Sequence, residues 1–234
     1  MKKLKVSIII TSYNDNEFLD GVLKDLKIQE FPISNLEILV LEAGNYSIER
    51  AKKNLGLKSK KLKFFNIKNL PRTTALNYLV SISKHELIIR LDARTKIYKK
   101  YLKDIVELAE EKVEANVGGI LLPVGKNDKQ IQIANIMKSP FFFGNGEFRR
   151  ENFKGYVNSI YLGSFRKSLM IKEPWFDEKN VLISEDSDLN YRILKSGGKI
   201  YLDSKIKVKH YCRESKYELL KLCFNYGIGR GLFF

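Results

Sequence analysis

The sequence predicts an α/β protein built on a mostly parallel sheet with helices on both faces. Short apolar runs rich in Val, Ile and Leu alternate with amphipathic segments of helical spacing through residues 1–124, as in repeated β-α units. Such continuous apolar strands are typical of parallel sheets that are buried on both faces. Residues 125–234 lack this regular alternation, so we expect a mixed C-terminal half.

Five strands are expected in the first half, because each is a short apolar run that ends at turn-forming or acidic residues. They span residues 6–11, 36–41, 62–67, 86–91 and 117–124. Helices are expected at 17–28, in a lysine-rich segment before residue 62, at 71–82 and at 97–113. Pro71 suits the first turn of the third helix, where its missing N–H leaves no bond unmade.

The second half is predicted to begin with a loop-rich stretch at residues 125–150 and a strand at 156–165. A helix opens at Ser184-Glu185-Asp186, runs to residue 194 and ends at Gly197-Gly198, a common signal for a helix C-terminus. Short strands at 199–202 and 206–209 and a helix at 215–226 follow. Since no internal repeat or linker is visible, we expect a single domain over 1–234, with halves at 1–124 and 125–234.

Composition limits the partner and the compartment. The chain has 234 residues, with 42 Lys plus Arg against 27 Asp plus Glu, hence a formal charge of +15. This charge favours an anionic partner: nucleic acid, a phosphate-bearing substrate or an anionic membrane face. Two cysteines argue against a disulfide framework and favour a reducing compartment. No apolar stretch is long enough to span a membrane and no signal-peptide pattern is present, so we expect a cytoplasmic protein.

Topology and residue type together locate a ligand site. In open sheets of this kind, ligands bind beyond the carboxyl ends of the parallel strands, here residues 12–14, 42–45 and 92–94. Asp92 follows an apolar strand and faces this crevice; it either helps to bind a divalent cation on a diphosphate or caps the next helix. His210 ends a basic strand and is either a metal or phosphate ligand or a satisfied structural residue.

A second acidic position lies at the start of a helix. Asp186 lies in the first turn and shares a face with two apolar residues, so it points toward the protein. A carboxylate placed there either stabilises the helix dipole or serves as a positioned base. Its neighbour Glu185 either binds an acceptor hydroxyl or is solvated.

Four segments carry a resemblance to a known family. They are Val6-Ser7-Ile8-Ile9-Ile10-Thr11-Ser12-Tyr13-Asn14, Ala75-Leu76-Asn77, Leu91-Asp92-Ala93-Arg94 at a DxD-like position, and Ser184-Glu185-Asp186 at an ED-like position. With these the chain resembles the family-2 glycosyltransferases over almost its whole length. A closer similarity, to the branch that builds succinoglycan-type exopolysaccharide, rests on Leu91-Asp92-Ala93, Gly144-Asn145-Gly146, Tyr161-Leu162-Gly163-Ser164-Phe165-Arg166, Asp188-Leu189-Asn190-Tyr191-Arg192 and Gly197-Gly198-Lys199-Ile200.

The resemblance implies a GT-A fold, which is Rossmann-like, and an inverting transfer of a hexose from a nucleotide-diphosphate sugar, UDP-linked as first choice. The acceptor would be saccharide or lipid-linked, in cell-surface or exopolysaccharide synthesis. Asp186 would act as general base with Glu185 beside it, and Asp92 and His210 would bind Mg²⁺ or Mn²⁺. The residues implied in nucleotide-sugar binding are Thr11, Ser12, Tyr13, Asn14, Glu42, Asn77, Asp92, Ala93 and Arg94.

Two positions depart from the family pattern. Glu42 stands where the family usually has Asp, which leaves the identity of the base open. Arg94 occupies the second acidic position of the DxD motif; a guanidinium cannot ligate a cation, but it clamps phosphate well. We hypothesise that Arg94 contacts the diphosphate directly and that the metal is held more weakly. These departures keep a non-catalytic nucleotide-sugar-binding homologue as the alternative.

Two basic clusters are either solvated faces or surfaces attracted to anionic inner-leaflet lipids, where the protein would bind peripherally. They comprise Lys52, Lys53, Lys58, Lys60, Lys61 and Lys63, and Lys199, Lys205, Lys207, Lys209, Arg213, Lys216 and Lys221. A nucleic-acid-binding protein is disfavoured, because the aromatic residues are not interleaved with Lys and Arg and no zinc-ligand or helix-turn-helix pattern occurs. A nucleotidyltransferase is disfavoured because the loop after the first strand is not glycine-rich.

Overall fold

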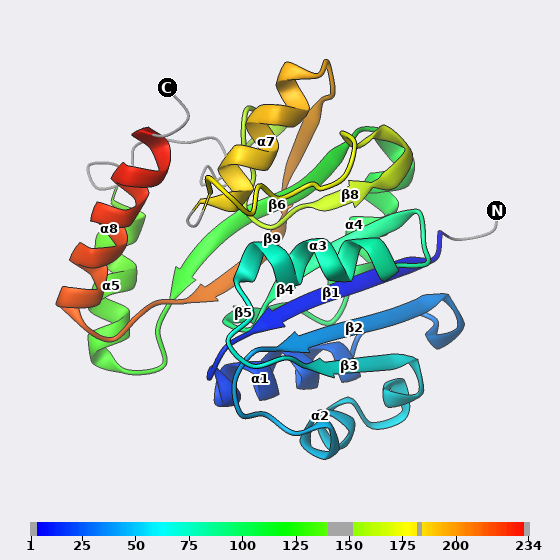
Figure 1. The fold of residues 1–234 in the computed structure, drawn as a ribbon, viewed down its shortest axis with the longest axis horizontal. Helices are drawn as coiled ribbons and strands as arrows, with labels where there is room; N and C mark the ends of the chain where they lie inside the picture. Colours follow the sequence, from blue (N-terminus) through cyan, green and yellow to red (C-terminus); the bar gives the residue numbers. More distant parts are fainter. Residues whose placement is uncertain (1–3, 140–151, 182–183, 232–234) are drawn as a thin grey trace.

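The computed structural model describes residues 4–139, 152–181 and 184–231, and a nine-stranded sheet runs through them (Figure 1). The sheet has the strand order β3-β2-β1-β4-β8-β6-β9-β5, and β7 pairs with β9 beside this path. The strands are β1 Val6–Ser12, β2 Leu36–Glu42, β3 Leu62–Asn66, β4 Leu87–Asp92, β5 Thr95–Lys96, β6 Asn116–Val124, β7 Lys154–Tyr156, β8 Ser164–Arg166 and β9 Ile200–Tyr211. Strands β3, β2, β1 and β4 are mutually parallel, whereas β8, β5 and β7 run antiparallel to their neighbours. The predicted α/β fold with a mixed C-terminal half is confirmed.

Helices cover both faces of the sheet, because alternate residues of each strand point to opposite sides. Ile8 and Ile10 of β1 belong to a core under α1, α2 and α4, whereas Ile9 belongs to the core under α3 and α7. The helices are α1 Asn16–Lys27, α2 Ile48–Leu55, α3 Arg72–Ile82, α4 Tyr101–Glu111, α5 Asp128–Lys138, α7 Glu185–Lys195 and α8 Lys216–Gly231. None of these described helices combines the length and the apolar character needed to cross a bilayer.

The helix expected at residues 97–113 begins later, at Tyr101, because the residues before it are held by a distant strand. Thr95 and Lys96 form the short strand β5 opposite His210 and Lys209 of β9. The partner strand lies far along the chain, so local sequence patterns contain no sign of this pairing.

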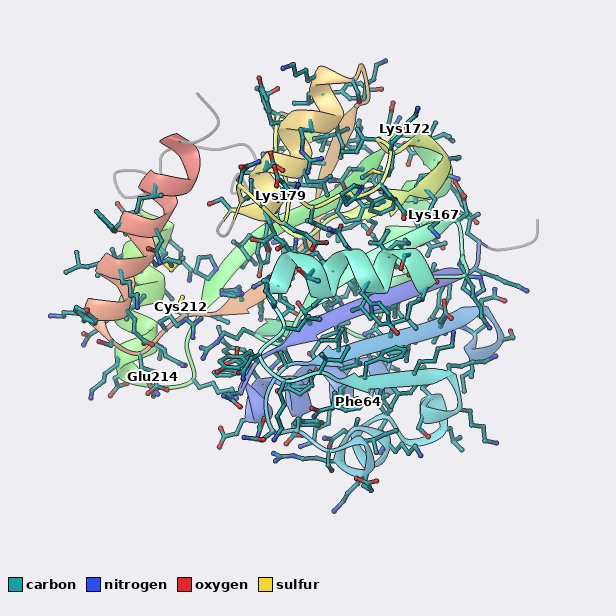
Figure 2. All side chains as sticks on the ribbon, in the orientation of Figure 1. Phe64, Lys167, Lys172, Lys179, Cys212 and Glu214 are labelled. Atoms are coloured by element: carbon teal, nitrogen blue, oxygen red, sulfur yellow. The ribbon has the colours of Figure 1, made fainter. Side chains whose placement is uncertain are left out.

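The loop predicted for residues 125–150 is wrong for 128–138, which form α5. Asn127 caps this helix, since its Oδ1 accepts a hydrogen bond from the Gln130 N–H at 3.0 Å. The apolar side of α5 packs against α8 in a small separate core near Cys212 (Figure 2). Because α8 lies at the other end of the C-terminal half, the sequence around residues 128–138 gives no sign that the apolar side of α5 is covered. Residues 140–150, with the Gly144-Asn145-Gly146 motif, lie outside the described part of the chain.

Two strand predictions also change. Residues 156–165 are not one strand, because β7 ends at Tyr156 and β8 begins only at Ser164. Conversely, the strands predicted at 199–202 and 206–209 are parts of the single strand β9, which begins at Ile200. The polar residues between them fall where the register against β6 shifts, so the strand bulges there instead of ending.

Lys58 does not belong to a charged surface, although the sequence places it in a lysine cluster. Its side chain is buried, and its ammonium group donates hydrogen bonds to the carbonyl oxygens of Lys27 at 2.7 Å and Gln29 at 2.9 Å. This buried lysine ties the segment after α2 to the end of α1.

Helix α7, which carries both acidic residues of the predicted ED motif, is fixed by a buried amide network. Asn190 donates hydrogen bonds to Ile160 O at 2.9 Å and to Ser159 Oγ at 3.1 Å, and accepts one from Asn116 Nδ2 at 2.8 Å. Asn116 in turn accepts a bond from the Ser164 N–H at 3.1 Å. The network joins α7 to β6 and to the turn before β8.

Replacing Asn190 with alanine should lower the free energy of unfolding by about 2 kcal/mol, because it leaves buried polar partners unsatisfied. Urea denaturation followed by circular dichroism measures this change. The control is Lys195→Ala, which alters an exposed side chain of the same helix and should leave stability within about 0.5 kcal/mol of the native value. Equal stability of the two variants would contradict the anchoring role of the network.

Candidate active site

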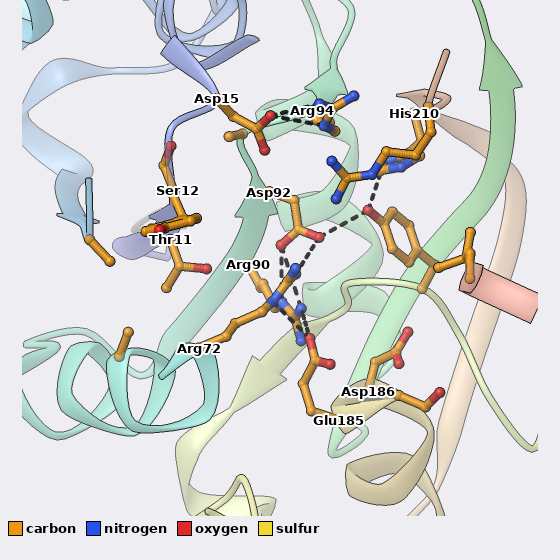
Figure 3. A pocket seen from close by; sticks show the side chains of 18 of the residues that line it. Thr11, Ser12, Asp15, Arg72, Arg90, Asp92, Arg94, Glu185, Asp186 and His210 are labelled. Atoms are coloured by element: carbon orange, nitrogen blue, oxygen red, sulfur yellow. Dashed lines mark hydrogen bonds and ion pairs between the residues drawn. The ribbon is translucent and has the colours of Figure 1, made fainter. Parts of the chain in front are cut away.

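A cavity of about 720 Å³ lies at the carboxyl ends of β1 and β4 (Figure 3). Its other side is formed by the start of α7, the end of β9 and helix α8. The parallel register places Thr11 opposite Asp92, so the two strand ends meet at one edge. Sequence-predicted residues that line the cavity are Thr11, Ser12, Tyr13, Asp92, Ala93, Arg94, Glu185, Asp186 and His210. Residues from both halves of the chain therefore share one cavity.

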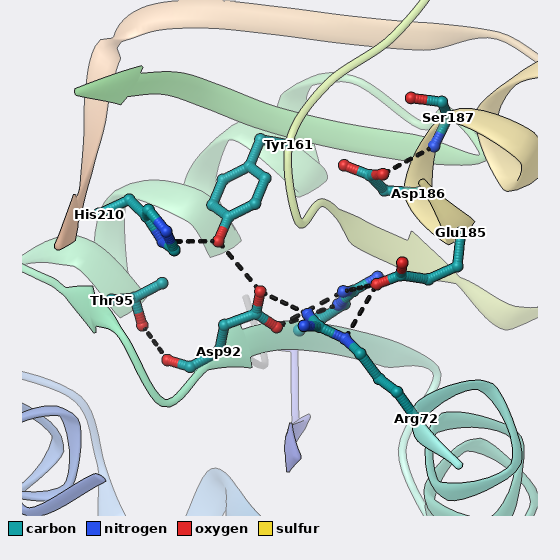
Figure 4. Close-up of polar contacts among 9 residues, drawn as sticks. Arg72, Asp92, Thr95, Tyr161, Glu185, Asp186, Ser187 and His210 are labelled. Atoms are coloured by element: carbon teal, nitrogen blue, oxygen red, sulfur yellow. Dashed lines mark hydrogen bonds and ion pairs between the residues drawn. The ribbon is translucent and has the colours of Figure 1, made fainter. Parts of the chain in front are cut away.

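Asp92, at the end of β4, is surrounded by donors. Its carboxylate forms an ion pair with Arg72 of α3 at 2.6 Å and a longer one with Arg90 at 3.5 Å, and accepts a hydrogen bond from Tyr161 Oη at 3.0 Å (Figure 4). Burial works to raise the pKa of Asp92, but the charges of Arg72 and Arg90 outweigh it and hold the pKa well below its usual range. Asp92 is thus an anion at every physiological pH.

Glu185 shares the same two arginines. Its Oε1 lies 2.5 Å from Arg90 NH2 and 2.9 Å from Arg72 Nε. Burial opposes ionisation of Glu185, yet the two guanidinium groups keep its pKa below the ordinary value. Two arginines and two carboxylates thus form one cluster, called here the arginine–carboxylate cluster, which joins β4, α3 and the start of α7.

Asp186 behaves differently from its neighbour. It accepts a hydrogen bond from the Ser187 N–H at 2.9 Å, and none of the ion pairs found between the described residues involves it. Burial and the negative charge of Glu185 raise its pKa to about 6. A carboxylate with that pKa is mostly ionised at neutral pH and is basic enough to accept a proton.

His210, at the end of β9, is linked to Asp92 through Tyr161. The phenol gives its only proton to Asp92, so the 3.0 Å bond between Tyr161 Oη and His210 Nδ1 requires that the histidine nitrogen donate. Burial lowers the pKa of His210 to about 4, so the ring is neutral at pH 7. Its Nε2 is then unprotonated and available as a ligand.

The side chains at the cavity decide whether a divalent cation can bind there. Asp92 and the Nε2 of His210 are suitable ligands, but no group of three or more His, Cys, Asp or Glu side chains among the described residues is arranged to hold a metal. Mg²⁺ usually takes only one or two carboxylates and completes its shell with water and phosphate oxygens. The cavity therefore fits a cation that arrives with a diphosphate, not one that is enclosed by protein ligands alone.

Arg94 is engaged at the wall of the cavity. Its guanidinium forms an ion pair with Asp15 at 2.7 Å and lies over the ring of Phe18, 4.2 Å from the centroid (Figure 3). Asp15 itself lines the cavity, so this pair faces the space that a ligand would fill.

Glu42 and Asn14 shape the loops beside the cavity but do not line it. The buried Oε1 of Glu42 accepts hydrogen bonds from the backbone N–H groups of Asn14 at 3.2 Å and Gly44 at 2.9 Å. A Cβ at Gly44 would lie 2.2 Å from Asn14 Oδ1, so only glycine permits this close approach. Ala43 and Tyr13, which are adjacent to these residues, do line the cavity.

Asn77 is not brought to the cavity. Its side chain donates hydrogen bonds to Phe176 O at 2.8 Å and Glu178 Oε1 at 2.7 Å, and accepts one from the Phe176 N–H at 2.9 Å. The structure thus places it as a tie between α3 and the segment that precedes α7.

The residues that hold the carboxylates of Asp92 and Glu185, which are Arg72, Arg90 and Tyr161, were not predicted from the sequence. Arg90 had a visible signal, because a charged residue inside an apolar strand requires buried partners. Arg72 had a weaker one, since a basic residue at a helix start is unfavourable without a nearby anion. Tyr161 precedes two residues with positive φ, Leu162 at 66° and Gly163 at 90°, and neither of these turn angles is evident from the sequence.

The fold and the shared cavity define a class. A parallel first half with an aspartate at the end of its fourth strand, facing an acidic pair across one cavity, is the arrangement expected for GT-A glycosyltransferases. The chain matches Glycosyl transferase family 2 over residues 7–172, and it belongs to this family.

Relatives of known structure or activity agree with this assignment. A dolichyl N-acetyl-alpha-D-glucosaminyl phosphate 3-beta-D-2,3-diacetamido-2,3-dideoxy-beta-D-glucuronosyltransferase of Methanococcus voltae is 24% identical over 239 residues, which cover 97% of this chain and 73% of that protein. S. aureus TarS 1-349 in complex with UDP-GlcNAc has a TM-score of 0.66 at 17% identity, covering 94% of this chain and 65% of its own. The mannosyltransferase PcManGT from Pyrobaculum calidifontis, in complex with GDP-Man and Mn²⁺, has a TM-score of 0.71 at 13% identity, covering 96% and 61%. Because the chain spans less than two thirds of both solved chains at low identity, these two show the GT-A fold alone.

The pKa of Asp186 should fall below 6 in Glu185→Gln, because the substitution removes the negative charge that raises it. Carbon-13 NMR of the aspartate carboxyl groups between pH 3 and 8 measures the midpoint. Glu178→Gln, at an exposed residue that does not line the cavity, is the matched control and should leave the midpoint unchanged. An unchanged midpoint in Glu185→Gln would mean that burial alone sets the pKa.

Proposed function

We propose that the protein is an inverting glycosyltransferase that moves a hexose from a nucleotide-diphosphate sugar, with UDP as the first base to test, to a hydroxyl of a saccharide or lipid-linked acceptor. The observation that carries this proposal is that Asp92 and Asp186, from opposite halves of the chain, line one cavity with opposite pKa shifts. Family membership supports the reaction class, and the TarS complex with UDP-GlcNAc supports the choice of a UDP sugar as the first donor.

The donor half of the site comprises residues 1–124. Thr11, Ser12 and Tyr13 lie where the nucleotide would be held. Arg94 would release its ion pair with Asp15 and bind the diphosphate instead. Asp92 and His210 would hold Mg²⁺ or Mn²⁺, which when bound would neutralise charge on the leaving diphosphate. The Mn²⁺ bound with GDP-Man in PcManGT supports trying that cation first.

The acceptor half comprises residues 125–234. Asp186 removes the proton of the acceptor hydroxyl, whose oxygen forms a bond to the anomeric carbon of the donor. The bond from that carbon to the diphosphate oxygen breaks in the same displacement, so the configuration inverts. Glu185 contributes by holding Arg72 and Arg90 in place and by raising the basicity of Asp186, since its own carboxylate is already bound by two arginines.

The biological setting is proposed on the same basis. The name of the Methanococcus voltae relative specifies a dolichyl phosphate-linked sugar as acceptor, which favours a lipid-linked acceptor for this chain as well. We place the reaction in cell-surface or exopolysaccharide synthesis, in the branch related to succinoglycan, and the protein in the cytoplasm at the inner face of the membrane.

The experiment that tests this function incubates the protein with UDP- and GDP-hexoses, Mn²⁺ and a lipid-linked sugar as acceptor, with water as acceptor in a parallel reaction, and measures nucleotide diphosphate release by chromatography. One donor should be turned over, and Asp186→Asn should reduce the rate by at least about 100-fold while retaining donor binding, because it removes the base but not the diphosphate contacts. The native rate should rise with pH through about 6, as Asp186 ionises.

Asp177→Asn, at a half-buried aspartate before α7 that does not line the cavity, is the matched control and should keep the native rate. Specific nucleotide binding without release of product by the native protein would instead support a non-catalytic sugar-nucleotide binder. Equal rates for the native protein and Asp186→Asn would refute the assignment of the base.

Arg94→Ala should weaken binding of nucleotide diphosphate by about ten-fold, because it removes a charge-assisted contact to phosphate. Titration calorimetry with UDP and GDP, with and without Mn²⁺, measures this. Arg94→Asp restores the second acidic position of the DxD motif; if it raises the affinity for Mn²⁺ and keeps full turnover, Arg94 is not a required clamp. Lys96→Ala, at an exposed residue two positions further on, provides the control.

A further inference from the structure

Helix α8 has an exposed apolar stripe that no other described element covers. Tyr217, Leu220, Phe224 and Ile228 are 74%, 67%, 70% and 49% exposed. Their spacing of three, four and four residues places them on one face of the helix. Single exposed apolar residues are common on proteins, but a continuous stripe of large ones marks an interaction surface.

The opposite side of α8 is already used. Leu219 packs with Ile133 and Met137 of α5 in the small separate core, and Leu222 and Asn225 line the active-site cavity. The helix therefore has an inward side that belongs to the core and cavity and an outward side that carries the stripe. In Figure 1, α5 and α8 stand together at one end of the molecule, beside the ends of β6 and β9.

The charges next to the stripe are mainly basic. Lys221 flanks it directly and Lys216 is exposed at the first position of α8, while Arg213 precedes the helix and lines the cavity. The acidic residues there are Glu218, which is exposed, and Glu214, which is tied to the start of α5 through hydrogen bonds of 3.2 Å to Asn127 and Gln130. Aromatic and aliphatic residues bordered by Lys and Arg on one helix are the pattern of segments that lie in the surface of an anionic bilayer.

We propose that the outward side of α8 docks onto an anionic lipid bilayer, and that this docking brings the cavity to the membrane surface where a lipid-linked acceptor lies. The stripe enters the headgroup region while the basic residues contact lipid phosphates. Because Leu222 and Asn225 on the inward side of the same helix line the cavity, docking holds the cavity about one helix diameter, roughly 10 Å, from the bilayer surface, within reach of the head group of an anchored acceptor. The acceptor part of this inference rests on the proposed transferase function, whereas the docking part does not.

Sedimentation with vesicles of equal parts phosphatidylglycerol and phosphatidylcholine tests the docking. The native chain should bind these vesicles, and pure phosphatidylcholine vesicles much more weakly. Leu220→Glu combined with Phe224→Glu should lower the partition coefficient at least about ten-fold, because two apolar anchors are replaced by anions. Val113→Glu is the matched control, since Val113 is 61% exposed and follows α4, outside both basic clusters.

Vesicle binding and thermal stabilisation by nucleotide diphosphate distinguish a failure of the docking proposal from a failure of the proposed function. Thermal stabilisation by nucleotide diphosphate in the absence of vesicles should be the same for the native chain and the double variant, as neither residue lines the cavity. Failure of the native chain to bind anionic vesicles would overturn the docking, as would equal binding by the double variant. A native dimer that becomes monomeric in the double variant, measured by sedimentation velocity, would assign the stripe to a second copy and also overturn it.

Discussion

The arginine–carboxylate cluster is the constraint on which the site depends. Arg90 is buried inside an apolar strand, and a guanidinium in that position is tolerated only when carboxylates neutralise it. Asp92 on its own strand and Glu185 from α7 are those carboxylates, and Arg72 from α3 completes the balance. The cluster therefore fixes the distance between the end of β4 and the start of α7, which carry Asp92 and Asp186.

The same cluster gives its acidic neighbours different tasks. Asp92 lies against two arginines and stays ionised, whereas Asp186 faces the cavity one residue beyond Glu185 and has its pKa raised by that carboxylate and by burial. Environments that push the pKa values of two acids apart are how enzymes assign one acid to electrostatics and another to proton transfer. Here the two arginines lower the pKa of Asp92, whereas burial and the carboxylate of Glu185 raise that of Asp186 against their influence.

Much of this arrangement can be predicted from the sequence. Apolar runs and their turn residues identify the strands, and parallel topology then places Asp92 at the ligand edge; helical periodicity turns Asp186 inward. The partners of these acids cannot be predicted locally, because Arg72, Tyr161 and Glu185 come from elements that meet only in three dimensions. Asn77 shows the converse: its segment matches the family pattern, but contacts to Phe176 take its side chain away from the cavity. Helix α5 was missed for the same reason, since its packing partner is α8.

Charge balance decides how a diphosphate can be bound. A diphosphate would bring several negative charges into a cavity in which Arg72 and Arg90 are already neutralised by Asp92 and Glu185. Compensating positive charge outside that cluster comes, among the described residues, from Arg94 and Arg213 on the cavity wall, and otherwise from a cation that binds with the ligand. Among the ion pairs of the described residues, Arg94 pairs with Asp15, whose side chain is 22% exposed, so a phosphate can replace this partner at lower desolvation cost than it can replace a buried one. In the proposed function, the arginine in the second acidic position of the DxD motif would therefore offset charge that the resemblance otherwise assigns to the cation.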